Sequence, residues 1–167
     1  VKDEQTFNAA LFNMLQTLVV VIDGEGRIVR FNGECERLSG YSSKEVEGKV
    51  FWDLAITPPE QRESLIARFS LLVTGEVDTT EIESHWYTKT GDLRWIYWKN
   101  RALFDDYGEL KFLIATGIDI TKSKLIELKL SESEQQYRTL FESMHSSLAV
   151  FNPIDGESGE PVDFEFV

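Results

Sequence analysis

The chain has 167 residues, 42% of them hydrophobic and 28% charged, which is typical of one soluble globular domain with appendages. Its 29 acidic and 17 basic residues give a net charge of −12 without a basic cluster, so nucleic acid is not an expected partner. The single cysteine, Cys35, excludes an internal disulfide and a cysteine-ligated zinc site, and it fits a reducing, cytoplasmic compartment.

The N-terminal residues 1–17 predict an amphipathic helix. Phe7, Leu11, Met14 and Leu18 follow one another at intervals that place them on one helical face. The apolar run that begins at Leu18 is far too short to span a bilayer, so we expect no membrane contact within the chain.

Two strands and a block of short helices are predicted next. Residues 18–22 are β-branched and apolar, residues 23–26 suit a tight turn, and residues 27–31 predict the return strand of a hairpin. Asn32 can cap a following helix that ends at a glycine. Two further helices are expected, one after a capping box and one that starts at a pair of prolines; they cover residues 42–48 and 58–75.

Three more strands are predicted, over residues 79–89, 94–104 and 109–120, with turns at Gly91 and Gly108. The helices lie between two groups of strands and do not follow each strand. This order argues against parallel winding and predicts an antiparallel α+β domain.

Residues 122–145 predict a long amphipathic helix with a heptad seam. The seam either packs on its own domain or forms a parallel homodimer, and its continuity with flanking opposed charges favours the homodimer. The apolar seam residues are Ile126, Leu130, Tyr137, Leu140 and Met144, with Ser133 as a weak position among them.

Residues 140–166 repeat the pattern of residues 11–31. In both places a Leu-Phe pair precedes an apolar run, an Asp-Gly turn and a second run. We interpret residues 146–167 as the truncated start of a second copy of the domain. Since a lone hairpin is marginally stable in water, we expect it to pack on a neighbour or to be poorly ordered.

Four motifs in this order resemble those of the PAS sensory domain, also called the sensory box. They are Ile22-Asp-Gly-Glu-Gly-Arg-Ile-Val-Arg-Phe-Asn32, Leu38-Ser-Gly-Tyr41 followed by Glu45 and Gly48, Thr90-Gly-Asp-Leu-Arg-Trp95, and Gly117-Ile-Asp-Ile-Thr121. The resemblance covers residues 18–121, and residues 131–141 are similar to the linker between tandem PAS domains.

The resemblance implies a five-stranded antiparallel sheet with short helices on one face and a small-molecule pocket between them. Amphipathic helices would flank this domain at both ends. Such a module belongs to bacterial or archaeal multidomain signal-transduction proteins, including two-component systems. We therefore expect a non-catalytic sensor of a small ligand or redox state. The helix over residues 122–145 would relay the signal to an output domain in the same chain, such as a histidine kinase or a diguanylate cyclase.

The alternative is a ligand-free PAS domain that acts only in dimerisation and protein interaction. An enzyme is ranked last, because no nucleophile–base pair, phosphate loop or metal-ligand cluster emerges from the sequence.

The resemblance also places the candidate site residues. In the family, the acidic residue of the terminal motif can pair with a neighbouring strand, which implies a signal relay of Arg94, Asp119 and Thr121. Antiparallel strands would bring Arg94 and Asp119 together. A plain hydrophobic core is the alternative for most of the pocket candidates, which are Phe31, Cys35, Leu38, Phe51, Trp52, Leu65, Phe69, Trp98 and Asn100.

No cofactor is diagnosed by the sequence. A flavin is the runner-up to no cofactor at all, because several tryptophans offer stacking surfaces but no residue is diagnostic of it. Haem-binding relatives usually carry a histidine in residues 59–73, which have none. Cys35 lacks the sequence context of a photochemical thiol and is expected in the core. Glu81, Glu83 and His85 share one face of a predicted strand, but a polar solvent face is the commoner reason for such a pattern, and no metal site is assigned.

Overall fold

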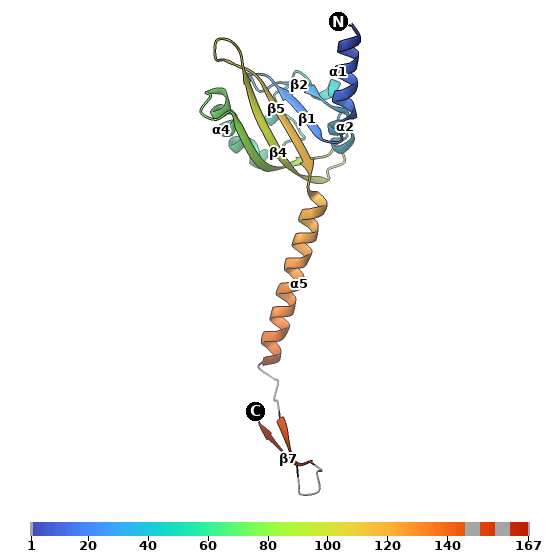
Figure 1. Cartoon of the computed structure of the whole chain (residues 1–167), viewed down its shortest axis with the longest axis vertical. Coiled ribbons are helices and arrows are strands. Elements are labelled where there is room, and N and C mark those ends of the chain that lie inside the picture. The colour runs from blue at the N-terminus through green and yellow to red at the C-terminus, as the bar shows by residue number, and fades with distance from the viewer. Residues whose placement is uncertain (1, 146–150, 156–160, 167) are drawn as a thin grey trace. The chain divides into compact units, whose positions relative to one another are not determined.

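The structure, a computed structural model, describes residues 2–145, 151–155 and 161–166, with side chains for residues 3, 6–8 and 10–143. Its centre is a five-stranded antiparallel sheet in the order β2-β1-β5-β4-β3 (Figure 1). The last strand therefore lies between the first hairpin and the second pair of strands. The strands are β1 (Leu18–Ile22), β2 (Ile28–Phe31), β3 (Thr79–Tyr87), β4 (Leu93–Phe104) and β5 (Leu110–Asp119).

Short helices fill the connection between β2 and β3. Asn32 caps the first of them by accepting a hydrogen bond from the backbone N–H of Cys35, and Gly40 ends it in the left-handed region at φ 77°. The next begins with the expected capping box of Ser42 and Glu45. These elements are α2 (Gly33–Ser39), α3 (Ser43–Val46), η1 (Phe51–Asp53), η2 (Pro59–Gln61) and α4 (Arg62–Val73).

The start of α4 differs from the prediction. Pro59 was expected in its first turn, but it begins the separate 3-10 turn η2, and the α-helix starts at Arg62. Such turns are frequent at the N-termini of α-helices, because the tighter hydrogen-bond pattern suits a chain that has just left a proline.

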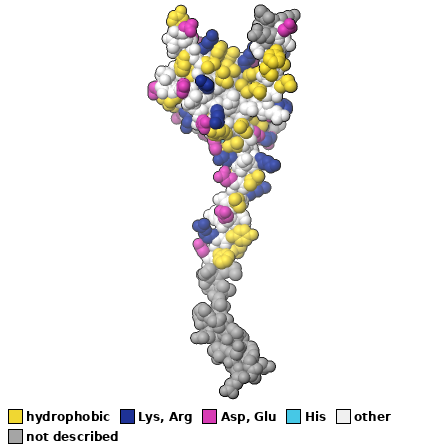
Figure 2. Space-filling model, viewed as in Figure 1, with side chains coloured by type: hydrophobic (Ala, Val, Ile, Leu, Met, Phe, Trp, Pro, Cys, Tyr) yellow, Lys and Arg dark blue, Asp and Glu magenta, His cyan; other side chains and the backbone are white. Residues whose placement is uncertain are grey.

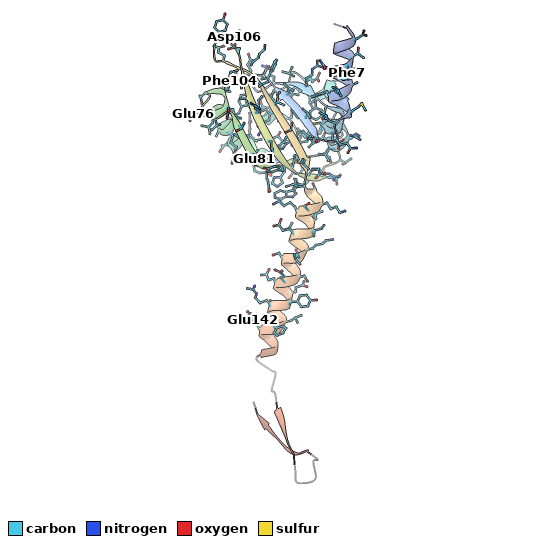
Figure 3. All side chains as sticks on the ribbon, in the orientation of Figure 1. Phe7, Glu76, Glu81, Phe104, Asp106 and Glu142 are labelled. Carbon is cyan, nitrogen blue, oxygen red and sulfur yellow. The ribbon has the colours of Figure 1, made fainter. Side chains whose placement is uncertain are left out.

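The N-terminal helix α1 (Lys2–Met14) ends three residues before the predicted boundary at residue 17. Leu18, whose spacing continues the apolar stripe but which was also predicted to begin the first strand, is buried as the first residue of β1. Phe7, labelled in Figure 3, is 61% exposed and Met14 is 78% exposed. Within the described part of the chain, this stripe is therefore not covered.

The core lies on one face of the sheet. Alternate residues of β1, namely Leu18, Val20 and Ile22, pack there with Trp98 of β4 and Phe69 of α4. Alternation places every second side chain of a strand on the same face, so the helices need to cover only that face. This confirms the predicted α+β fold, with the five-stranded sheet and the short helices on one side.

The chain divides into two units, residues 1–124 and 125–167, and each is described by itself. Helix α5 (Thr121–His145) starts directly after β5. In the second unit, β6 (Phe151–Asp155) pairs antiparallel with β7 (Pro161–Phe166). The first predicted strand of this hairpin, at residues 148–151, and its turn at residue 156 lie mostly outside the described residues.

Within the described residues, no helix is long and apolar enough to cross a membrane.

Candidate functional site

The core encloses a cavity of about 90 Å³ between the inner face of the sheet and α4. Most of its wall is apolar and comes from β1, β2, α4 and the strands β3, β4 and β5. A small number of polar groups in an apolar concave site is typical of small-molecule pockets. The polar wall residues are Thr57, Arg68, Thr80, Ser84, His85 and Asn100.

Six of the nine pocket candidates line this cavity. Asn100 is half-buried there, and its amide donates a hydrogen bond of 3.1 Å to the hydroxyl of Thr80 on the neighbouring strand. The amide nitrogen of Asn100 therefore has a partner within the chain. The six candidates at the wall are Phe31, Phe51, Leu65, Phe69, Trp98 and Asn100.

Three pocket candidates do not line the cavity. Leu38 packs against the outside of the core cluster. Trp52 lies over the turn of the first hairpin, where a Cβ on Gly26 would come within 2.3 Å of its ring, so its indole covers the turn and not the cavity. Cys35 is 0% exposed in α2 and donates a hydrogen bond to the backbone carbonyl of Val19 at 3.6 Å.

Burial raises the pKa of the Cys35 thiol from 9.0 to about 12. The reactive species of a cysteine is the thiolate, so a thiol that stays protonated and enclosed is inert. Its surroundings are those of a core residue.

Sequence reasoning missed most of the wall that β3 supplies. Thr80, Ile82, Ser84 and Trp86 occupy alternate positions of that strand and all line the cavity. The signal was present as the two-residue period of a half-buried strand. The sequence of the strand alone does not tell which of its two faces turns toward the core. His85 also belongs to the wall, but it lies between Ser84 and Trp86, so its ring is on the opposite face of the strand, where it is hydrogen-bonded to the side chain of Gln61 at the end of η2.

The cavity does not fit the larger cofactors of the resemblance. A cavity of about 150 Å³ holds one benzene molecule, so 90 Å³ is too small for a flavin or a porphyrin ring. Within the described residues, no group of three potential ligands is placed to hold a metal ion. Glu81, labelled in Figure 3, pairs with Lys99, while Glu83 pairs with Lys124 at 2.9 Å.

The second feature is the junction where β5 passes into α5. Arg94 Nη1 lies 3.7 Å from Asp119 Oδ2, and the two side chains are 39% and 30% exposed. The other carboxylate oxygen of Asp119 accepts a hydrogen bond of 2.8 Å from the backbone N–H of Thr121. The hydroxyl of Thr121 accepts a bond of 2.9 Å from the backbone N–H of Trp95. Asp119 and Thr121 thus tie the first residue of α5 to β4.

Arg94 is incompletely satisfied in this arrangement. Its Nε is buried without a hydrogen-bond partner in the described structure, and 3.7 Å is too long for a hydrogen bond to Asp119. Buried polar atoms without partners are rare enough to need an explanation.

A short chain of ring contacts connects β3, the strand that supplies part of the cavity wall, with this junction. The ring of His85 lies edge-on to that of Trp95, with 3.8 Å between their centroids. On the first turn of α5, Lys124 places its ammonium 5.7 Å from the centroid of Trp95. One wall residue of the cavity therefore contacts a residue that holds the start of α5.

The seam residues of α5 are exposed in the single chain. Ile126, Leu130, Tyr137 and Leu140 are between 57% and 67% exposed. Figure 2 shows hydrophobic side chains among charged ones along this helix. The side chain of Met144 lies outside the described residues.

Comparison with protein families matches residues 12–125 to the family described as the PAS fold. Among curated proteins, the chain is 27% identical over 109 residues to the protein named Probable diguanylate cyclase DgcE of Escherichia coli (strain K12). That match covers 65% of this chain but 10% of the relative, so the chain spans about a tenth of the relative's length.

Solved structures share the fold. The PAS domain of a protein from Colwellia psychrerythraea superposes with a TM-score of 0.62 at 22% identity, over 72% of this chain and 99% of that one. The PAS domain of the RpfR quorum-sensing receptor of Cronobacter turicensis, solved in complex with BDSF, gives 0.53 at 25% identity, over 64% and 95%.

Proposed function

The chain belongs to the PAS fold family, and on this premise we propose that it is a non-catalytic sensory module that couples a small ligand in its cavity to helix α5. The observation that carries the proposal is the double role of the His85–Trp95 contact. His85 lies between the cavity-lining residues Ser84 and Trp86 and places its ring against Trp95. The backbone N–H of Trp95 donates to the hydroxyl of Thr121 at the start of α5. A change in the wall can therefore reach the helix through one ring contact and one hydrogen bond.

The proposed relay has two arrangements of the Arg94–Asp119 pair. The orphaned Nε of Arg94 supports this, because a tighter pairing with Asp119 would be a second state of the same residues. The input must bind the two states with different free energies, and a reversal from 1:99 to 99:1 needs about 5.5 kcal/mol. The incomplete pair makes the described arrangement less stable than it could be, which lowers the difference that a ligand has to supply.

The output is proposed to lie in another domain of the same protein. The relative DgcE supports a diguanylate cyclase as one such domain, and a histidine kinase of a two-component system is the other class that we propose. We propose a cytoplasmic location, with the buried Cys35 thiol kept reduced.

We further propose that α5 forms a parallel homodimer through Ile126, Leu130, Tyr137 and Leu140. Their exposure in the single chain supports this. The family match covers one PAS domain, residues 12–125. The hairpin of β6 and β7 is proposed to open a second one, as the internal sequence repeat suggests.

A ligand-free module that acts only in dimerisation is the second candidate. The specific observation in its favour is the size of the cavity, since ligand pockets typically measure about 300–1,000 Å³ and this one about 90 Å³. Mass spectrometry of small molecules released from the purified protein separates the two candidates, because only a sensor would carry a stoichiometric ligand.

The relay is tested with Arg94→Ala in the full-length protein. We expect altered output with a small change in the melting temperature, because the Arg94–Asp119 pair is partly exposed and weak. Arg101→Ala is the matched control, since Arg101 is an exposed arginine on the same strand, β4, away from the junction. Unchanged output from a folded Arg94→Ala protein would show that the pair is not part of the relay.

A further inference from the structure

Arg68 of α4 is the only formally charged residue among those that line the cavity within the described structure. The other polar wall groups are hydroxyls, an amide and an imidazole. Because the chain as a whole carries a net charge of −12, a single cation at an apolar cavity is a local reversal of the prevailing charge. Such a reversal attracts an anion.

The guanidinium of Arg68 is available for a ligand. In the described part of the chain it has no ion pair or hydrogen bond, and its side chain is exposed, so it stands at the mouth of the cavity and not inside it. The residues three and four positions away on the helix are Ser64, Leu65, Leu71 and Leu72, none of them acidic. By contrast, Arg62 on the same helix pairs with Asp53.

We propose that the cavity takes a small monocarboxylic acid, whose carboxylate pairs with Arg68 and whose hydrocarbon part fills the apolar interior. This inference rests on the proposed function as a ligand sensor and names the class of the ligand. One guanidinium matches one carboxylate, because its planar fork can donate two parallel hydrogen bonds to the two oxygens. A cationic ligand would be repelled.

A phosphate ester fits the site less well. Phosphate sites usually add a helix N-terminus or a glycine-rich loop, whose backbone N–H groups share the second negative charge. Arg68 lies in the middle of the twelve-residue α4, and among the described residues no glycine lines the cavity. A single negative charge is therefore what the site can neutralise.

The volume limits the length of the hydrocarbon part. A cavity of about 150 Å³ accommodates benzene, which has six carbons, and this cavity measures about 90 Å³. In proportion, the interior holds a chain of roughly four carbons, with the carboxylate outside it at Arg68. Longer acids would leave their extra methylenes in water.

The first experiment measures binding of butyrate, pentanoate and hexanoate to the chain by titration calorimetry and by quenching of Trp86 and Trp98, which line the cavity. The affinity should rise about fourfold for each added methylene, and the gain should stop once the cavity is filled, which octanoate and dodecanoate would report. Hexanol has the same number of carbons as hexanoate without the charge and should bind about tenfold more weakly. Hexylammonium should not bind.

The second experiment repeats the titrations with variants of α4. Arg68→Gln should weaken hexanoate about tenfold and leave hexanol unchanged, whereas Arg68→Lys should keep part of the affinity because it keeps the charge. Arg62→Gln is the matched control on the same helix and should leave both affinities unchanged. Melting temperatures of all variants check that the exposed substitutions leave the chain folded.

Three results would overturn the inference. Equal affinities for hexanol and hexanoate, or an Arg68→Gln protein that binds hexanoate as the original chain does, would refute the carboxylate while leaving a sensor of neutral ligands intact. Absence of binding by every probe would refute the cavity as the site of such acids. Only if no ligand is released from the purified protein, and Arg94→Ala also leaves output unchanged, does the proposed function itself fail.

Discussion

Asn32 offers the sharpest test of how this fold is held together. Its side chain is fully buried and uses all of its hydrogen-bonding groups. The carbonyl oxygen accepts from the backbone N–H groups of Val19 and Cys35, each at 3.1 Å. The amide nitrogen donates to the backbone carbonyls of Thr17 at 2.9 Å and Phe12 at 3.2 Å. One amide therefore joins the end of α1, the start of β1 and the start of α2.

The substitution Asn32→Ala removes all four bonds at once. The carbonyls of Phe12 and Thr17 lie at a partly buried position where water can replace the lost donor. The N–H groups of Val19 and Cys35 are buried and cannot be rehydrated without opening the core. Each buried unsatisfied group costs about 1–3 kcal/mol, so we expect a loss of about 4 kcal/mol in the free energy of unfolding. That is a large part of the roughly 5–15 kcal/mol that stabilises a typical domain.

Urea unfolding followed by tryptophan fluorescence measures this loss. With a slope of about 2 kcal/mol per molar urea, the midpoint should fall by about 2 M. Asn13→Ala is the control, because Asn13 accepts a single exposed hydrogen bond from the backbone N–H of Gly33, and its loss should cost less than about 1 kcal/mol. A loss for Asn32→Ala no larger than that of the control would refute the reasoning that buried N–H groups dominate the effect.

Three further outcomes are expected. Iodoacetamide at pH 8 should leave Cys35 unmodified in the native chain and alkylate it in urea, as mass spectrometry would detect, because burial raises the thiol pKa to about 12; rapid native alkylation would contradict this. The Lys89 ammonium, with help from Ser42, lowers the pKa of the Glu45 carboxyl from 4.5 to about 2. This pairing stabilises the fold above the ordinary carboxyl pKa, and the stabilisation is lost as the pH falls towards 2. Lys89→Met should therefore raise the pKa of Glu45 measured by NMR titration. An unchanged pKa would show that Lys89 does not cause the low value. Leu140→Glu should weaken self-association in sedimentation, and an unaffected mass would argue against the α5 seam.

The local elements of the domain could be predicted because their signals lie within a few residues. The cap at Asn32, the left-handed Gly40 and the capping box of Ser42 and Glu45 each depend on neighbours in sequence. Where two local patterns overlapped, long-range pairing decided between them. Leu18 has the spacing of a helical stripe, yet β1 is paired on both sides, with β2 and β5, and this pairing buries Leu18 in the sheet.

The ends of the strands were also foreseeable, since antiparallel pairing of β4 with β5 brings Arg94 towards Asp119 whatever the side chains around them. The residues of the cavity wall could be predicted only in part. Whether Trp52 turns to the cavity or covers Gly26, and whether Arg68 stands at the mouth, depends on how α4 and its preceding turn lie over the sheet.

The amino-acid sequence by itself thus determined the order of elements and the PAS family, because capping, turns and strand alternation act over short distances. Only the tertiary structure decided which side chains enclose the cavity and that His85 connects it with Trp95. These contacts join residues distant in sequence, and their geometry results from packing the whole core at once.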